Sequence, residues 1–277
     1  DGSAMYWLEN GFDQRFLTEK AQDLYVLMTG KSARDGNPTI SVIDQGEGQC
    51  PSNFGTSFMK LGSSNKEKIP FTQGKYGMGS TGVFPFCSEK HRFQIVVSRR
   101  DPALLNGTVS QSDKNWGCTV VRRRRSNEGE KNSVWEYLAP IGCDSKPNEG
   151  NVLEADLRTL PIIPAEGKDH RPFAKEIEHG TLIKMIEYQV GRGLKGQGTG
   201  RGGLYRHLNL QMPECHLPVR FADTRVKTSS SGGFLNAVGS VYSITTQAEA
   251  DLECDVKGNV TVQGENIPVR ALLLERS

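Results

Sequence analysis

Two glycine-rich motifs constrain most strongly what this chain folds into. The first, Asp44-Gln45-Gly46-Glu47-Gly48, directly follows a short β-branched run at 39–43, so it begins where a predicted strand ends. A carboxylate at that position accepts a hydrogen bond from an exocyclic amine, and Gly46 and Gly48 let a flat ring approach the backbone. Taken alone, the motif also fits a tight turn after a strand.

The second motif, Gly74-Lys75-Tyr76-Gly77-Met78-Gly79, opens a helix predicted over 77–87. Backbone N–H groups at a helix N-terminus form an anion site, to which Lys75 adds charge. Alone, this motif also fits an ordinary glycine-rich loop. The polar stretch at 62–75 between the motifs has few apolar residues, which predicts a mobile segment able to close as a lid. Order and spacing therefore predict an adenine-type site and a phosphate-type site on either side of a lid.

Hydrophobic periodicity predicts the other elements. Apolar residues recur at helical spacing over 15–29, with Gly30 as a C-cap, and a weak helix is expected around 54–61. Strands are predicted at 39–44, 93–98, 118–122, 134–138 and 180–186, and a short helix at 204–212. The strands at 118–122 and 134–138 are expected to form a hairpin. Short β segments are expected at 219–221, 238–244, 260–262 and 269–274.

These elements predict an α/β fold, a two-layer sandwich whose mixed, mostly antiparallel sheet carries helices on one face. The glycine run at 191–203 is low in complexity, so we expect it to be flexible and to mark a boundary. The predicted organisation is a nucleotide-binding domain at 1–190, a linker with a short helix at 191–209, and the start of a second, β-rich unit at 210–277.

Composition excludes several classes of protein. Apolar residues make up 36% of the 277 and there are 31 glycines, which is too close to the globular norm for a disordered chain. The 34 basic and 32 acidic residues leave a net charge of +2, so no global field attracts nucleic acid or membrane. No transmembrane run or signal peptide is recognised, and none of the six cysteines forms a Cys-x-x-Cys pair. We therefore expect a cytoplasmic protein with free thiols and no membrane partner.

The order of these features resembles the GHKL superfamily. The strand with Asp-x-Gly-x-Gly, the lid, the Gly-x-x-Gly-x-Gly helix start and a later Gly180-Thr181 strand occur in that order over about 38–190. The group includes DNA gyrase B subunits, MutL-type repair proteins, ATP-dependent heat-shock chaperones, MORC proteins and sensor histidine kinases. The segment Lys-Leu-Gly-Ser-Ser-Asn-Lys at 60–66 is most similar to the chaperone and MORC branches. The resemblance implies a Bergerat-type ATP-binding fold.

The resemblance also implies roles for particular residues. Asp44 would bind the adenine amino group, and Thr181 would support the same network through water, although Thr181 also fits an ordinary strand residue. Gly46 and Gly48 would shape the adenine wall. Residues 62–76 would be the ATP lid, and 210–277 would resemble the start of a transducer unit. The phosphates would be held by the second motif, which comprises Gly74, Lys75, Tyr76, Gly77, Met78 and Gly79.

The chain departs from the family upstream of Asp44. The family carries a helix there with a Glu that acts as general base and an Asn that holds Mg²⁺. No Glu-x-x-x-Asn helix precedes Asp44, since Glu9 and Asn10 are adjacent. Two interpretations stay open: the sequence is an N-terminally truncated fragment, which the missing Met favours, or the protein binds nucleotide without hydrolysing it. No catalytic or metal-binding residue is assigned.

The sequence therefore predicts a protein that binds ATP and, when complete, hydrolyses it with Mg²⁺ to drive a conformational change or association with a partner or a second copy. The alternative is a nucleotide-sensing interaction module without turnover, acting on nucleic acid. Four consecutive arginines at 122–125 offer phosphate contacts, but a solvated strand edge is the preferred interpretation. A sensor kinase is disfavoured because no helix with a phosphoacceptor His precedes the core.

Overall fold

The fold is taken from a computed structural model. The structure describes residues 22–32, 35–59, 82–88, 92–105, 107, 110–124, 126, 134–140, 152–163, 175–191, 194, 203–212, 217–225, 235–240, 252–262 and 264–274.

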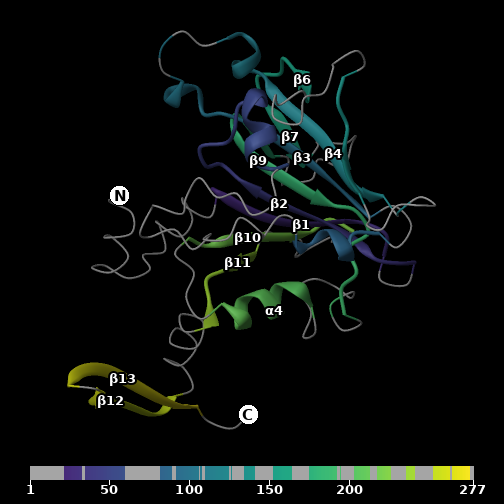
Figure 1. The fold of residues 1–277 in the computed structure, drawn as a ribbon. Helices are drawn as coiled ribbons and strands as arrows, with labels where there is room; N and C mark the ends of the chain where they lie inside the picture. Colours follow the sequence, from purple (N-terminus) through teal and green to yellow (C-terminus); the bar gives the residue numbers. More distant parts are fainter. Residues whose placement is uncertain are drawn as a thin grey trace.

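A nine-stranded sheet forms the body of this part of the chain (Figure 1). Its strands lie in the order β11-β10-β1-β2-β9-β3-β4-β5, with β6 also paired to β4. Every pair is antiparallel except β1 with β10, which is parallel. The strands are β1 (Leu24–Gly30), β2 (Pro38–Asp44), β3 (Phe93–Arg99), β4 (Trp116–Arg124), β5 (Val134–Tyr137), β6 (Leu153–Ala155), β9 (Gly180–Met185), β10 (Val219–Asp223) and β11 (Leu235–Ala237).

The remaining described elements are short. Two hairpins lie outside the main sheet, β7 (Leu160–Ile163) with β8 (Lys175–Ile177) and β12 (Leu252–Val262) with β13 (Glu265–Leu274). The helix α4 covers Leu204–Gln211, and 3-10 helices cover Pro51–Thr56 (η1), Phe84–Phe86 (η2), Pro102–Leu104 (η3) and Ser112–Lys114 (η4). The mixed, mostly antiparallel sheet and α4 are confirmed. Whether helices cover one face of the sheet stays a prediction.

The helix predicted over 15–29 is wrong where the structure describes it, because residues 24–30 form strand β1. Its middle residues, Tyr25 to Met28, are all buried. β1 has a neighbour on each edge and apolar clusters on both faces, so a continuous apolar run suits it as well as it suits a helix. The weak helix expected around 54–61 is a 3-10 turn at 51–56 instead. Of the helix expected over 77–87, residues 77–81 lie outside the described residues, and the described remainder contains a 3-10 turn at Phe84–Phe86.

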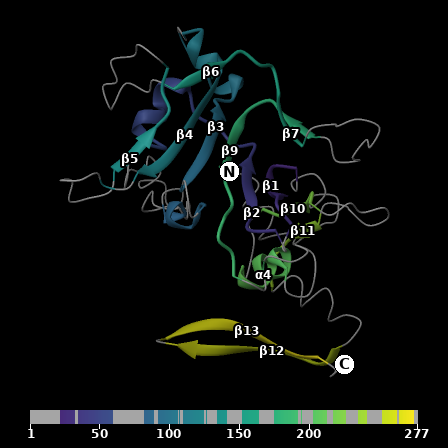
Figure 2. The same cartoon turned by 90° about the vertical axis from the view of Figure 1, so that its right-hand side faces the viewer.

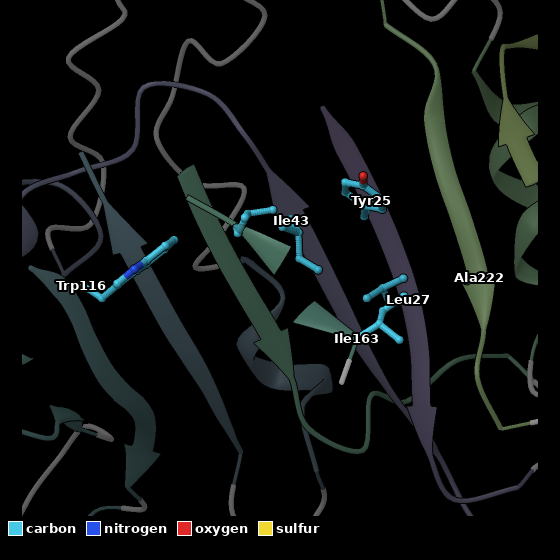
Figure 3. Close-up of a cluster of buried hydrophobic side chains, with 7 residues drawn as sticks. Tyr25, Leu27, Ile43, Trp116, Ile163 and Ala222 are labelled. Atoms are coloured by element: carbon cyan, nitrogen blue, oxygen red, sulfur yellow. The ribbon is translucent and has the colours of Figure 1, made fainter. Parts of the chain in front are cut away.

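Alternation places side chains on two faces of the sheet. On the first face, a cluster of seven buried residues joins the sheet to the β7–β8 hairpin (Figure 3). Its members come from strands of the main sheet and of the hairpin: Tyr25, Leu27, Ile43, Trp116, Ile163, Ile177 and Ala222. On the second face, Met28, Ile40 and Phe221 pack with Leu204 of α4, and Val96 and Val121 pack with Phe54 of η1. The second face therefore carries two separate clusters.

The C-terminal part of the chain divides between two sheets. β10 pairs with β1, and β11 pairs with β10, so residues on both sides of position 210 belong to the main sheet. The strand expected at 238–244 is not found over 238–240, residues 241–244 lie outside the described residues, and β11 at Leu235–Ala237 was not expected. The β12–β13 hairpin lies apart from the main sheet in both views (Figures 1 and 2). The division at 210 into a separate unit stays a prediction.

Four cysteines lie within the described residues, and all four are free thiols: Cys50, Cys87, Cys118 and Cys254. Burial raises the pKa of the Cys87 thiol to about 12. Because the thiolate is the reactive form, Cys87 is an inert core residue. No helix in the described ranges is long and apolar enough to cross a bilayer.

Candidate functional site

Asp44 and Thr181 are directly paired residues on two adjacent central strands. Asp44 is the last residue of β2, and its register partner in β9 is Thr181. Directly paired residues in an antiparallel sheet lie on the same face with Cα atoms about 4.5–5.5 Å apart. Asp44 is half-buried and Thr181 is buried. The structure thus brings together two residues that the sequence places far apart.

The turn after Asp44 is held by its own side chain. Gly46 N–H donates to Asp44 Oδ1 at 3.0 Å, an Asx-type contact that folds the chain back. His179 Nδ1 lies 3.0 Å from the Gly46 carbonyl oxygen, which ties the turn to the residue before Gly180. These contacts place Gly46 on the exposed rim of the site, next to the Asp44 carboxylate.

Gly48 is required by packing. Its φ of +61° lies in the left-handed region, and a Cβ there would meet the Arg99 carbonyl oxygen at 1.8 Å. Gly180 has the matching role on β9, with a φ of +114° and a Cβ position 2.0 Å from the Asp44 carbonyl oxygen. The close approach that the structure describes at Gly48 is therefore to protein backbone, and the ring contact expected there stays a prediction.

Ser98 joins the parts of this site, although it belongs to neither of the two sequence motifs. Its Oγ accepts from Gln49 N–H at 2.9 Å, donates to the Gly180 carbonyl at 2.9 Å and lies 3.0 Å from Thr181 Oγ1. Ser98 is fully buried, and its register partner in β9 is Thr181. One hydroxyl thus links the glycine turn, β3 and β9. A Ser within a predicted buried strand was the signal available in the sequence.

Val42 also belongs to neither motif. It lies two residues before Asp44 on the same face of β2, and 43% of its surface is exposed although β2 is a central strand. Its register partner, Ile183, is only partly buried. By register Val42 and Ile183 are on the second face, but they belong to neither of its two clusters. Val42 and Ile183 therefore form an apolar surface beside Asp44 and Thr181, and a flat heteroaromatic ring needs such a surface to pack on.

Charged groups surround the turn. Arg100 Nη1 lies 2.8 Å from Glu47 Oε2, and Asp101 N–H donates to the Glu47 carbonyl at 2.8 Å. The Arg99 guanidinium donates to three loops, reaching the carbonyls of Lys114 and Arg158 at 2.8 Å and that of Glu178 at 3.2 Å. These bonds fix the loops around the Asp44 turn and do not point to a reactive group there.

A distant relative of the chain is found among known proteins, although no family model matches. The relative is the B subunit of type 2 DNA topoisomerase 6 from Methanococcoides burtonii, which is 24% identical over 185 residues. The alignment covers 56% of this chain and 30% of that protein, so the chain spans less than a third of the relative's length. The support for the GHKL superfamily is distant.

Other parts of the expected site lie outside the described residues. These are the lid at 62–76 and the whole second motif: Gly74, Lys75, Tyr76, Gly77, Met78 and Gly79. Their roles stay predictions. Within the described ranges, no group of three or more His, Cys, Asp or Glu side chains is arranged to hold a metal ion. We therefore assign no Mg²⁺ ligand.

The arginine run at 122–125 carries less free charge than its sequence implies. Arg122 Nη2 lies 2.8 Å from Glu136 Oε2, and Arg124 Nε lies 2.6 Å from Glu136 Oε1. Glu136 comes from the paired strand β5. The pairing with Glu136 favours the solvated strand edge over a nucleic-acid contact.

Proposed function

We propose that this chain binds ATP through a GHKL-type pocket on the second face of the sheet. The observation that carries the proposal is the pairing of Asp44 with Thr181 above the exposed Val42. A carboxylate beside an apolar strip matches adenine, which offers an exocyclic amine on the edge of a flat ring. The distant similarity to a topoisomerase component supports the same coarse function.

The described residues fit the base of the nucleotide. Asp44 and Thr181 supply oxygen acceptors, and Val42 and Ile183 supply the apolar surface. The glycine motif at 74–79 would hold the phosphates on backbone N–H groups, and the segment at 62–76 would close over them. When bound, Mg²⁺ would neutralise phosphate charge, and ATP hydrolysis in the complete protein would drive a conformational change or association with a partner or second copy. The residues that would position water and metal are unassigned.

A second candidate function is nucleotide sensing without turnover. It is the alternative that stays open while no general base or Mg²⁺ ligand is assigned in this chain. Both functions use the same base-binding residues, so binding alone does not separate them. Phosphate release by a chain that extends further upstream would favour hydrolysis. ATP binding without phosphate release in that longer chain would favour sensing.

Replacing Asp44 by Asn tests the pocket. Asn keeps one oxygen that accepts from Gly46 N–H, but it replaces the other carboxylate oxygen by an NH₂ donor facing the site. We expect Asp44→Asn to weaken ATP binding by at least about tenfold, because a hydrogen bond to a charged acceptor is lost and a donor opposes the adenine amine. Isothermal titration calorimetry measures the affinity.

Asp35→Asn serves as the matched control. Asp35 is an exposed aspartate in the turn between β1 and β2, at the end of β2 opposite Asp44, and its side chain accepts from Ser32 Oγ. This variant should bind ATP as the wild type does. Equal ATP affinity in wild type and Asp44→Asn would refute the proposed site.

A further inference from the structure

The hydroxyl groups of Ser98 and Thr181 have a defined hydrogen-bond direction. Ser98 Oγ carries one hydrogen, and two acceptors lie within reach, the Gly180 carbonyl at 2.9 Å and Thr181 Oγ1 at 3.0 Å. The Gly180 carbonyl can only accept. Both contacts are hydrogen bonds at once only when Ser98 donates to Gly180 and Thr181 donates to Ser98. Gln49 N–H, 2.9 Å from Ser98 Oγ, uses acceptor capacity and leaves that direction unchanged.

The direction matters because it fixes what Thr181 offers a ligand. With its hydrogen directed at buried Ser98, Thr181 Oγ1 presents only lone pairs to the site. Asp44, its register partner on the same face, is also an acceptor when ionised. The base edge therefore meets two acceptors side by side.

We propose that Ser98 is a positioning residue that holds Thr181 as an acceptor, so that the pocket prefers a 6-amino purine over a 6-oxo purine. This inference rests on the proposed function. Asp44 alone discriminates poorly between 6-amino and 6-oxo purines, because a carboxylate also accepts a hydrogen bond from the N1–H of a 6-oxo purine. That docking brings the 6-oxo oxygen to Thr181, where two acceptors oppose each other. An amine at position 6 has two hydrogens and satisfies both residues.

Removing the Ser98 hydroxyl frees the Thr181 hydroxyl to turn. Thr181 then donates to a 6-oxo oxygen as readily as it accepts from an amine. The probes are ATP and inosine triphosphate, which differ only in the base. In Ser98→Ala, we expect the ratio of ATP affinity to inosine triphosphate affinity to fall about tenfold, mainly through tighter binding of inosine triphosphate. Calorimetric titration of each nucleotide gives the ratio.

Two further variants separate positioning from a structural role. Ser98→Cys fills nearly the same volume with a weak acceptor and should lower the ratio in the same direction, which also covers failure of Ser98→Ala to fold. Ser98→Thr keeps the hydroxyl and should keep the wild-type ratio. If Ser98 had a purely structural role, its variants would bind ATP and inosine triphosphate more weakly by the same factor, and the ratio of the two affinities would stay unchanged. Thermal unfolding without ligand establishes that each variant is folded.

The outcomes for this inference and for the proposed function are distinguishable. A wild type that binds ATP, with an unchanged ratio in folded Ser98→Ala or Ser98→Cys, overturns the role of Ser98 and leaves the ATP site standing. A wild type that binds neither nucleotide overturns the proposed function and this inference with it.

Discussion

At the scale of single residues, the turn after β2 contains a glycine, Gly48, that the fold itself requires. Gly48 is buried at a positive φ against the Arg99 carbonyl, and Gly180 is in a similar position against the Asp44 carbonyl. These two contacts let β2, β3 and β9 end close together. The three strand ends then present Asp44, Ser98 and Thr181 in one place.

Gly48→Ala tests this role of the turn. The new methyl group would overlap the Arg99 carbonyl oxygen and would sit at a φ that disfavours alanine, so neighbouring backbone must move. We expect the free energy of unfolding to fall by about 2 kcal/mol or more. Urea denaturation followed by circular dichroism measures it.

Gly258→Ala is the control for this substitution. Gly258 lies in β12, and a Cβ there would have open space around it. The free energy of unfolding should change by less than about 0.5 kcal/mol. Similar losses in both variants would contradict a specific role for the close contact at Gly48.

At the scale of elements, β4 and β5 were predicted as a hairpin, and the pairing is confirmed. Glu136 on β5 accepts from Arg122 and Arg124 on β4. Hydrogen bonds from these two arginines lower the pKa of the Glu136 carboxyl below its usual 4.5. The ion pairs among these three side chains therefore join β4 to β5 near the edge of the sheet.

These ion pairs predict that the stability of the fold depends on pH. Since the pKa of Glu136 is lowered in the folded state, its stabilising effect is present above pH 4.5 and is lost as the pH falls through the lower, folded pKa. We expect Glu136→Gln to lower the melting temperature at pH 7 and to have a smaller effect at acidic pH, once the pH has fallen through the lowered pKa and the carboxyl has taken up its proton. Calorimetric melts at the two pH values test this. An equal effect at both would show that the ion pairs are not the cause.

At the scale of the whole molecule, the parallel pairing of β1 with β10 joins strands from the two ends of the main sheet's sequence. Phe221 of β10 is fully buried among Met28, Ile40 and Leu204. Thr224 N–H also donates to the Met28 carbonyl at 2.9 Å. Residues 219–223 are therefore part of the main sheet and its core, whereas the later β12–β13 hairpin forms a separate sheet.

Two truncations test this arrangement. A chain ending at Met212 lacks β10 and β11, so it exposes β1 and the cluster around Phe221, and we expect it to unfold or aggregate at about 25 °C. A chain ending at Ser240 lacks only the β12–β13 hairpin among the described strands, and it should melt within a few degrees of the full chain. Circular dichroism melts measure both. Stable folding of the shorter chain would support an independent domain before residue 210.

Local pattern by itself determined the strands that alternate or carry β-branched runs. β2, β3, β4, β5 and β9 follow the predicted segments because side-chain period and β-branching are local properties. The same local signal failed for β1, since a fully apolar run at residues 25–28 suits a buried strand and a helix equally. The sequence also placed the Asp44 motif at the end of a strand, where the structure has it.

Tertiary structure alone decided which residues meet. Nothing local indicates that Thr181 is the partner of Asp44, that Ser98 bonds to both Gln49 and Gly180, or that Val42 stays exposed in a central strand. Strand order and register set these contacts, and both depend on pairings between segments distant in the sequence. The sequence determined the chemical groups of the candidate site, and the packing of the sheet decided their arrangement.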